Sequence, residues 1–268
     1  MKAISSRDNP RIRLLLKLIA QPRECRRQQL TVLDGVHLLR SLLDSGGHPL
    51  WGAVTGLALT RDEVAAAVAD STQRGTEWFE LPEALFKAVA PTAHPSGVLA
   101  LFPLPLAAGP TGPDAAQGLG DQAFVLMLEA IQDPGNLGTL LRSAQGAGVA
   151  CVALSPGCAE PWSPKVLRAG MGAHFFLDLY EDVDLPALAA QRGGVWAAAA
   201  DGGRTAWQAP LANARGLVIG NEGAGITPAL RAACQGSVAI PLQAGCESLN
   251  AAIAGSVLLF ERARQRLD

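Results

Sequence analysis

From residue 122 onward, short apolar segments alternate with segments of helical periodicity, and this alternation constrains the fold more than any other feature of the sequence. Short apolar runs bounded by turn residues are typical of strands, and a repeated strand and helix order favours a mostly parallel sheet with helices on both faces. The predicted fold class is therefore α/β. The predicted strands lie at 124–128, 151–154, 175–179, 195–199, 217–219 and 238–240.

A smaller alternation of the same kind precedes this region. It predicts a small α/β domain over residues 1–104. Residues 105–121 are rich in Pro, Gly and Ala and lack periodicity, so they are interpreted as a linker to a second domain at 122–268. The helices of the first domain are predicted at 10–18, 36–43, 62–71 and 82–89, and its strands at 30–33, 51–57, 77–80 and 98–102.

An apolar strand, a polar turn and an amphipathic helix follow one another between residues 124 and 144. The Asp-Pro-Gly sequence at 133–135 predicts the turn, and Asn136 is the expected N-cap of a helix that begins at Leu137. Arg142 lies off the apolar stripe of this helix, so its guanidinium and the free amides of the helix start are expected to converge on an anion such as phosphate. The alternative is an exposed arginine on an ordinary surface helix. The apolar stripe consists of Leu137, Leu140, Leu141 and Ala144.

The composition is that of a globular protein with a large core. The chain has 268 residues, of which 49% are hydrophobic and 17% are charged. It has no apolar run of about 18 residues that would span a membrane, and its first residues lack the apolar region of a signal peptide. The five cysteines form no C-x-x-C pair, which favours reduced thiols and a cytoplasmic location. The four histidines are scattered, so no metal site is predicted.

The net charge of −2 hides a basic N-terminus. Residues 1–29 carry eight Lys or Arg and two Asp or Glu, a local charge of +6. A cationic patch on an otherwise acidic protein is typical of binding to a polyanion such as RNA. The alternative is an amphipathic helix that packs through its apolar face while the arginines face water. The predicted RNA-binding residues are Arg7, Arg11, Arg13, Lys17, Arg26 and Arg27.

Two later segments are strand-to-loop transitions, at 217–226 and 240–250. In open α/β sheets ligands bind beyond the carboxyl ends of strands, where glycines let the backbone approach closely. The glycines of the first segment follow the order G-x-x-G-x-G, which differs from the dinucleotide fingerprint G-x-G-x-x-G, and alone they indicate only a tight turn.

The last helix is predicted from Leu249 to about Arg266, with Ser248 as its N-cap. Three arginines lie in its final turns, where positive charges complement the helix dipole. One face of this helix carries Leu249, Ile253, Val257 and Phe260.

Together, three segments resemble the motifs of the SpoU/TrmH family of RNA ribose 2′-O-methyltransferases, within the SPOUT class. They read N-x-G-x-x-x-R-S-A at 136–144, I-G-N-E-G-x-G at 219–225, and I-P followed by S-L-N within 240–250. Upstream, S-x-x-x-N-P-x-I at 5–12 and G-V-L-A at 97–100 are similar to the N-terminal RNA substrate-binding domain of many family members, whose fold is similar to a small ribosomal protein.

The resemblance implies S-adenosylmethionine as the cofactor, bound in a C-terminal trefoil knot. It also implies a homodimer whose site lies close to the interface. The appended N-terminal domain favours ribosomal RNA over tRNA as the substrate. The cofactor-binding residues implied are Ala199, Gly220, Ile240 and Leu249, and the catalytic residues implied are Arg142, Asn136, Glu222, Ser248 and Asn250.

The chemistry that the resemblance implies needs no metal. The sulfonium already activates the methyl group, so the enzyme must align the ribose 2′-oxygen and help remove its proton. A guanidinium has a pKa above about 12 and therefore keeps its proton at neutral pH. Our hypothesis is that Arg142 binds the adjoining phosphate and stabilises the developing oxyanion, while the proton passes to a phosphate oxygen or water. Asn136, Ser248 and Asn250 are expected to hold Arg142 and the ribose, oriented by Glu222; for Ser248, simple helix capping is the alternative.

Three alternatives stay open at this stage: a tRNA substrate, a catalytically silent RNA-binding protein of the same fold, and a nucleotide-dependent oxidoreductase. The second is disfavoured by the intact set of polar residues in the motifs. The third is disfavoured because neither half has a dinucleotide fingerprint in its first strand-to-helix turn.

Overall fold

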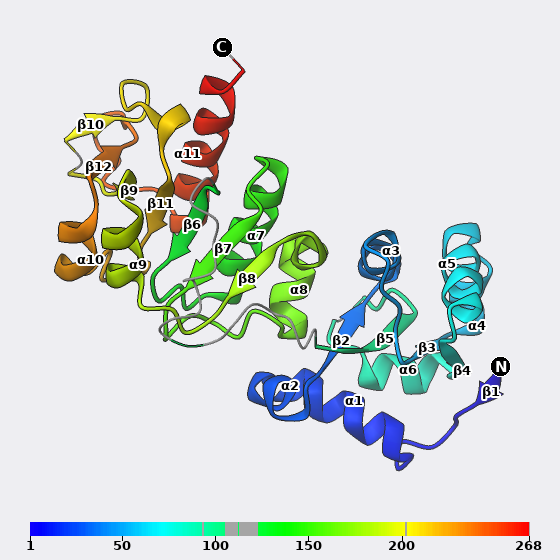
Figure 1. The fold of residues 1–268 in the computed structure, drawn as a ribbon. Helices are drawn as coiled ribbons and strands as arrows, with labels where there is room; N and C mark the ends of the chain where they lie inside the picture. The colour runs from blue at the N-terminus through cyan, green and yellow to red at the C-terminus, as the bar shows by residue number, and fades with distance from the viewer. Residues whose placement is uncertain (93, 105–111, 113–122, 202, 268) are drawn as a thin grey trace. The chain divides into compact units, whose positions relative to one another are not determined.

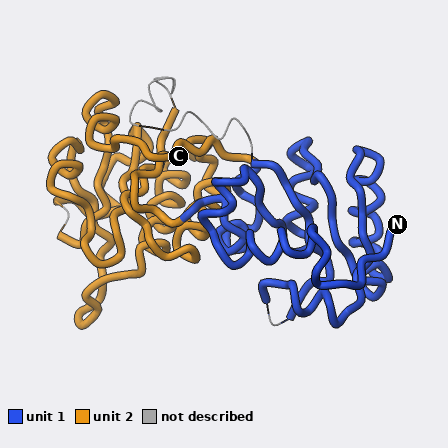
Figure 2. The backbone as a smooth tube through the Cα atoms, turned by 90° about the horizontal axis from the view of Figure 1, so that it is seen from below, with its two compact units in different colours: residues 1–106, 160–175 blue, residues 107–159, 176–268 orange. Residues whose placement is uncertain are grey.

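The computed structural model describes residues 1–92, 94–104, 112, 123–201 and 203–267 (Figure 1). The contacts between residues divide the chain into two compact units (Figure 2). Unit 1 comprises Met1–Leu106 with Glu160–Phe175, and unit 2 comprises Ala107–Ala159 with Phe176–Asp268. The predicted linker at 105–121 lies outside the described residues, apart from residue 112. None of the helices in the described ranges has the length and apolar character needed to cross a membrane.

Unit 1 is built on a five-stranded mixed sheet with the order β1-β4-β3-β5-β2. Its strands are β1 (Lys2–Ala3), β2 (Leu30–Asp34), β3 (Trp51–Val54), β4 (Glu77–Glu80) and β5 (Val98–Pro103). Its helices in the N-terminal part are α1 (Pro10–Ala20), α2 (Pro22–Gln28), α3 (Val36–Asp44), α4 (Gly56–Leu59), α5 (Asp62–Gln73) and α6 (Glu83–Val89). The β4 strand pairs in parallel with β1 and β3, whereas β5 is antiparallel to β3 and β2.

Most predicted elements of unit 1 are confirmed within two residues at each end. The strand predicted at 51–57 is wrong at its end, because the Thr55 side chain accepts a hydrogen bond from the Ala58 amide at 3.1 Å and caps α4. The predicted helix α1 packs through Ile12, Leu15 and Leu18, which are fully buried.

The segment at 160–175 contains α8 (Pro164–Gly170) and is grouped with unit 1, although the sequence predicts a second domain that runs unbroken from 122 to 268. Helix α8 packs against β2, and the Thr31 hydroxyl donates a hydrogen bond to the Trp162 carbonyl at 2.6 Å. The rings of Phe102 and Phe175 meet edge to face at 5.6 Å. These contacts are between residues about 70 or more positions apart, which is why periodicity along the chain did not reveal them.

Unit 2 is built on a seven-stranded sheet in which every neighbouring pair is parallel, with the order β10-β12-β9-β11-β6-β7-β8. This confirms the α/β prediction with a parallel sheet. Strands such as β6 read as continuous apolar runs because both of their faces are buried. The strands are β6 (Val125–Leu128), β7 (Cys151–Leu154), β8 (Asp178–Tyr180), β9 (Val195–Ala198), β10 (Arg204–Thr205), β11 (Gly216–Ile219) and β12 (Gly236–Ala239).

Helices cover both faces of this sheet (Figure 1). They are α7 (Pro134–Gly146), α9 (Leu185–Arg192), α10 (Pro228–Ala233) and α11 (Ala251–Gln265). On one face, α9 and α10 share a core cluster with Val218, whereas Ile219, the next residue, lies on the other face against α11. Helices α7 and α11 approach closely at Gly255, where an added Cβ would lie 2.4 Å from Leu140.

The predicted buried stripe of α7 is confirmed, since all four of its apolar residues are inaccessible. Helix α11 differs from expectation. It packs on α7 through small residues around Gly255, and it leaves Ile253 and Phe260 of its apolar face 50% and 52% exposed. Exposed apolar residues spaced by seven on one helix form a stripe that faces away from the core.

Candidate active site

A cavity of about 190 Å³ lies at the carboxyl ends of three neighbouring strands of unit 2. Its wall is formed by the residues that follow β9, β11 and β12 and by the start of α11. This is the edge at which parallel α/β sheets bind ligands. All four of the predicted cofactor-binding residues line it, namely Ala199, Gly220, Ile240 and Leu249.

The loop after β11 is held in shape by its own backbone and by one side chain. Asn221 and Gly225 exchange two backbone hydrogen bonds of 3.0 and 2.9 Å. The Asn221 side-chain oxygen accepts from the Gly223 amide and the next amide, both at 2.9 Å, while its amide group donates to the Ala130 carbonyl at 2.7 Å. Asn221 therefore ties this loop to the loop after β6. The motif at 219–225 contains Asn221 but does not reveal this structural role, although an asparagine beside glycines at a strand end is a turn signal.

Three of the five predicted catalytic residues form one hydrogen-bonded chain. The Asn136 amide group donates to the Glu222 carboxylate at 3.0 Å, and the Asn250 amide group donates to the Asn136 side-chain oxygen at 2.9 Å. The Glu222 carboxylate also accepts from the backbone amides of Gln132 and Asp133 at 3.3 and 3.2 Å. The ends of β6 and β11 and the start of α11 are thus joined beside the cavity.

Both predicted helix caps are corrected. Asp133, not Asn136, caps α7, because its side chain accepts from the Asn136 amide at 2.8 Å and Pro134 takes the first helical position. Asn250, not Ser248, caps α11, since its side-chain oxygen accepts from the first free amides of that helix. Asn136 is thereby left to bond Glu222, and Ser248 lies on the cavity wall.

The surroundings of the Glu222 carboxyl favour its ionised form. Partial burial acts to raise its pKa, but the hydrogen bonds from Asn136 and from backbone amides together outweigh burial and hold the pKa below its ordinary value of 4.5. The network therefore contains one negative charge with its lone pairs directed at amide donors. An ionised Glu222 fixes the Asn136 amide as a donor toward it, which leaves the Asn136 oxygen to accept from Asn250.

The Glu222→Gln variant is expected to be slightly less stable at neutral pH, by less than about 1 kcal/mol because the side chain is exposed. A carboxylate whose pKa is lowered by folding stabilises the protein above its unfolded pKa, and this contribution is lost as the pH falls through the lower folded value. The difference in melting temperature between wild type and variant should therefore be constant above about pH 5 and shrink in more acidic buffer.

Thermal unfolding between pH 3 and 7 measures this difference. Glu247→Gln is the matched control, because Glu247 is exposed nearby and makes no hydrogen bond within the described residues. A Glu222→Gln difference that does not vary with pH would contradict the assigned ionisation.

Arg142 is exposed on α7 and is not among the residues that line the cavity. Within the part of the chain that the structure describes, it has no hydrogen bond or ion pair, so the expected bonds from Asn136, Ser248 and Asn250 to its guanidinium are not present in a single chain. The neighbouring Ser143 hydroxyl lies 2.7 Å from that of Ser256 on α11, which fixes this part of α7 against α11. Arg142 is thus an unpaired cation on a rigid helix.

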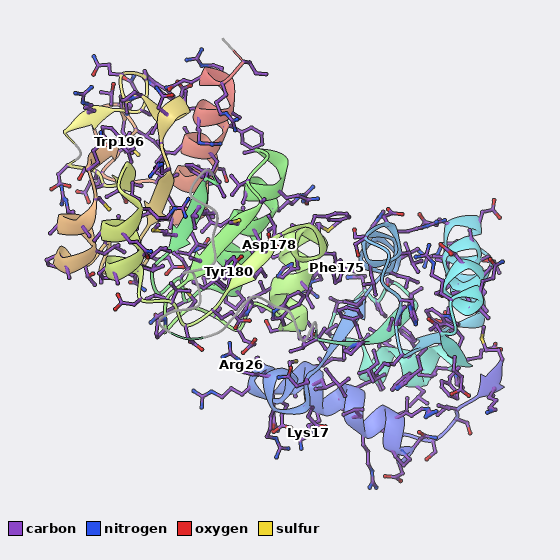
Figure 3. All side chains as sticks on the ribbon, viewed as in Figure 1. Lys17, Arg26, Phe175, Asp178, Tyr180 and Trp196 are labelled. Carbon is purple, nitrogen blue, oxygen red and sulfur yellow. The ribbon has the colours of Figure 1, made fainter. Side chains whose placement is uncertain are left out.

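The predicted RNA-binding cations of unit 1 are mostly paired with carboxylates. Arg27 and Lys17 both bond Glu24, at 2.8 and 3.1 Å, and the hydrogen bond from Arg27 is the main cause that lowers the pKa of Glu24 to about 2. Arg26 pairs with Glu160 at 3.2 Å, and Figure 3 labels it and Lys17 on α2 and α1. The three cations are 39–64% exposed and so accessible to phosphates, whereas the side chains of Glu24 and Glu160 are only 13–14% exposed.

Arg11 is more structural than the others. It bonds Glu77 at 2.9 Å and stacks over the Phe79 ring at 4.4 Å. Arg13 pairs with Asp8, while Arg7 is exposed and has no partner among the described residues.

A family model described as the SpoU rRNA Methylase family matches residues 123–260, which include the cavity and the hydrogen-bonded chain beside it. The chain belongs to this family. The 23S rRNA (guanosine(2553)-2′-O)-methyltransferase RlmP of Bacillus subtilis is 30% identical to it over 264 residues, covering 97% of this chain and 98% of that protein. The resemblance seen in the sequence is thereby confirmed.

Solved structures of SpoU-type enzymes share the whole fold. A crystal structure of an RNA 2′-O ribose methyltransferase superposes with a TM-score of 0.84 at 27% identity, and covers 100% of both chains. The AdoMet-bound rRNA methyltransferase from Sinorhizobium meliloti superposes with a TM-score of 0.83 at 24% identity, over 100% of this chain and 99% of that one. Among the residues of this SpoU protein that the structure describes, no three or more His, Cys, Asp or Glu are grouped so that they could hold a metal ion.

Proposed function

We propose that this protein transfers a methyl group from S-adenosylmethionine to a ribose 2′-hydroxyl of structured RNA, with ribosomal RNA as the substrate. The main observation behind this function is the cavity at the carboxyl ends of β9, β11 and β12. Glu222 lines this cavity and begins the row of hydrogen bonds that runs through Asn136 to Asn250. Membership of the SpoU family and the 23S rRNA activity named for RlmP support the reaction and the substrate.

The cavity suits the cofactor in its chemistry. Its lining is mostly apolar or backbone and includes Gly220 and Ile240 at strand ends and Leu249 before α11, which favours an adenine ring that bonds to main-chain groups. Glu222 is the only charged side chain that the described residues contribute to the wall. When bound, S-adenosylmethionine supplies a methyl group on a positively charged sulfur.

Side chains of the protein orient the ribose and stabilise the charge that develops in the reaction. Asn136, Asn250 and Ser248 orient the ribose, and Glu222 fixes the direction of the Asn136 amide. Arg142 binds the phosphate beside the reacting ribose and stabilises the negative charge that develops on the 2′-oxygen, while a phosphate oxygen or water takes the proton. The unpaired state of Arg142 in one chain supports this role, since a free guanidinium is available to an RNA phosphate.

We assign residues 1–104 as the RNA substrate-binding domain. Lys17 and Arg26 on α1 and α2 are 39% and 44% exposed beside their carboxylate partners, and Arg7 has no partner in the described part of the chain. We also propose a cytoplasmic location, which the free cysteines support.

We further assign residues 122–268 as a SPOUT domain with a C-terminal trefoil knot. The strand order supports this assignment, because β12 lies beyond β9 whereas α11 packs on α7. The segment 240–250 must therefore return across the carboxyl edge of the sheet, where the cavity lies.

We also propose a homodimer, which the exposed stripe of α11 supports. Ile253 and Phe260 are half exposed on this helix, and Phe260 also lies beside Gly146 at the end of α7. A second copy of the chain is the occupant that the family resemblance implies, and this interface would bring the site close to the partner.

The Ile253→Glu variant is expected to shift the protein from dimer to monomer, with the dimer dissociation constant raised at least about 100-fold by a buried, unpaired carboxylate. Light scattering after size-exclusion chromatography measures the mass. Leu57→Glu removes an exposed leucine from unit 1 and serves as the control. A dimer that persists in Ile253→Glu would contradict the assigned interface.

The function is tested by incubating the protein with methyl-labelled S-adenosylmethionine and ribosomal RNA, then locating 2′-O-methyl nucleotides. Label in 23S-type rRNA is expected. Label in tRNA alone would overturn the substrate assignment, and RNA binding without label would favour the catalytically silent alternative.

A further inference from the structure

A second cavity, of about 440 Å³, opens at the opposite edge of the same sheet. Its wall is formed by residues just before β6, β7 and β11 and by the end of α11, so it lies at the amino ends of these strands. Of the three, only β11 also borders the cofactor cavity, at its carboxyl end. Figure 1 shows the C-terminal end of α11 projecting beyond the sheet at this side. Three arginines line the cavity, Arg215, Arg262 and Arg266, and the described lining contains no Asp or Glu.

Arg262 is the decisive residue. Arg262 is only 6% exposed, and its guanidinium carbon lies 3.8 Å from the centre of the Phe124 ring. The buried Nε has no hydrogen-bond partner, and no ion pair involving Arg262 exists in the described ranges. Burial, with a smaller contribution from Arg266, lowers its pKa to about 10. A buried charge without a counter-charge destabilises the protein, so an anion bound beside Arg262 would be strongly stabilised.

Compensation of the helix dipole does not explain Arg262. Arg264 fits that explanation, because it is exposed in the last turn and bonds Glu261 at 2.9 Å. Arg262, in contrast, is buried and lines a cavity whose other two cations add to the same positive potential.

Hydrogen bonds hold two parts of the cavity wall in place. Gln265 accepts a hydrogen bond from the Ala212 amide and donates one to the Ala209 carbonyl, both at 3.1 Å, and so ties the end of α11 to the segment before β11. The Arg215 guanidinium donates to the Arg192 carbonyl at 2.9 Å, which holds its stem across Gly194. Arg215 and Arg262 are therefore held beside this space before any ligand arrives, which lowers the entropic cost of binding.

We propose that this basic cavity binds a phosphate group, separately from the cofactor. Forked guanidinium groups match phosphate oxygens, and a cavity of this size falls in the range of about 300–1,000 Å³ typical of small-molecule sites. The phosphate comes either from a free phosphate or nucleotide or from the backbone of bound RNA.

The test titrates inorganic phosphate and AMP into the full-length protein, saturated with S-adenosylmethionine so that the cofactor cavity is filled, and follows the heat of binding. Arg266→Gln is expected to weaken binding by about tenfold or more, because it removes a charged hydrogen-bonding group. Arg264→Gln is the matched control, being a neighbouring arginine that is already paired with Glu261. Both positions are exposed, so both variants are expected to fold, and their melting temperatures check this.

A second arm measures affinity for ribosomal RNA fragments against salt. If RNA supplies the phosphate, Arg266→Gln lowers the slope of log K against log salt by about 1, and Arg264→Gln does not. If the source is a free anion, the RNA slope is unchanged and only phosphate or AMP affinity falls. Equal behaviour of the two variants in both arms, or no phosphate or AMP binding together with an unchanged RNA slope, would overturn the proposal.

Discussion

Replacing Arg142 by alanine is expected to lower kcat for RNA methylation by about 100- to 1,000-fold, the loss typical when one group that stabilises a developing oxyanion is removed. The affinity for S-adenosylmethionine should not change, because Arg142 does not line the cofactor cavity. The fold should also persist, since the side chain is exposed and makes no bond that the described residues record. Single-turnover methyl transfer and cofactor titration separate the two effects.

The control on the same helix is Gln145→Ala, which removes another exposed polar side chain from α7. A second variant, Arg142→Lys, keeps the charge but loses the fork that binds two phosphate oxygens at once. We expect Arg142→Lys to remain strongly impaired. Near-normal activity of this variant with an unchanged pH–rate profile would contradict the need for a guanidinium.

The strands of unit 2 were predictable where both of their faces are buried. The segment at β6 is apolar at every position, so it reads as a strand without knowledge of its neighbours. Edge strands gave a weaker signal. The strand predicted at 175–179 began too early, because residues Ala173–Phe176 form a short 3₁₀ helix and β8 starts only at Asp178. The two-residue strand β10 has an exposed arginine and no periodicity to detect.

Helix caps were predicted in the right places but assigned to the wrong side chains. Before α7 the chain offers Asp133 and Asn136, and before α11 it offers Ser248 and Asn250. All four residue types are good caps. The choice depends on where the backbone first turns helical, which is at Pro134 and at Ala251. In α7 the Asn136 side chain bonds Glu222 instead of capping the helix, whereas Asn250 both caps α11 and bonds Asn136.

The members of the candidate site were identifiable from motifs, whereas their contacts were not. Asn136 and Glu222 are 86 positions apart, and Asn136 and Asn250 are 114 apart. Nothing in local periodicity brings such residues together; only the strand order does. The same limit applies to the basic cavity, where Arg262 looked like an ordinary charge at a helix end until its burial against Phe124 was seen.

Gly220→Ala is expected to lower the free energy of unfolding by about 1–3 kcal/mol or more and to weaken cofactor binding at least about tenfold. A Cβ at this position would lie 2.4 Å from the carbonyl carbon of Gly225 and 2.5 Å from its oxygen. These are backbone atoms in a loop that Asn221 and Gly225 close with two hydrogen bonds, so neither side can yield without opening the loop. Opening it would displace the wall of the cofactor cavity.

Gly223→Ala is the control that isolates this cause. It lies in the same loop, but its added Cβ would meet only the Asn221 side-chain oxygen, at an ordinary contact distance of 3.6 Å. Chemical denaturation and cofactor titration of the two variants should therefore diverge, with Gly223→Ala close to wild type. If both glycines tolerate alanine equally, the close approach of Gly220 to Gly225 is not what shapes the cavity. If both variants lose cofactor binding without losing stability, the loop acts through its flexibility instead of its packing.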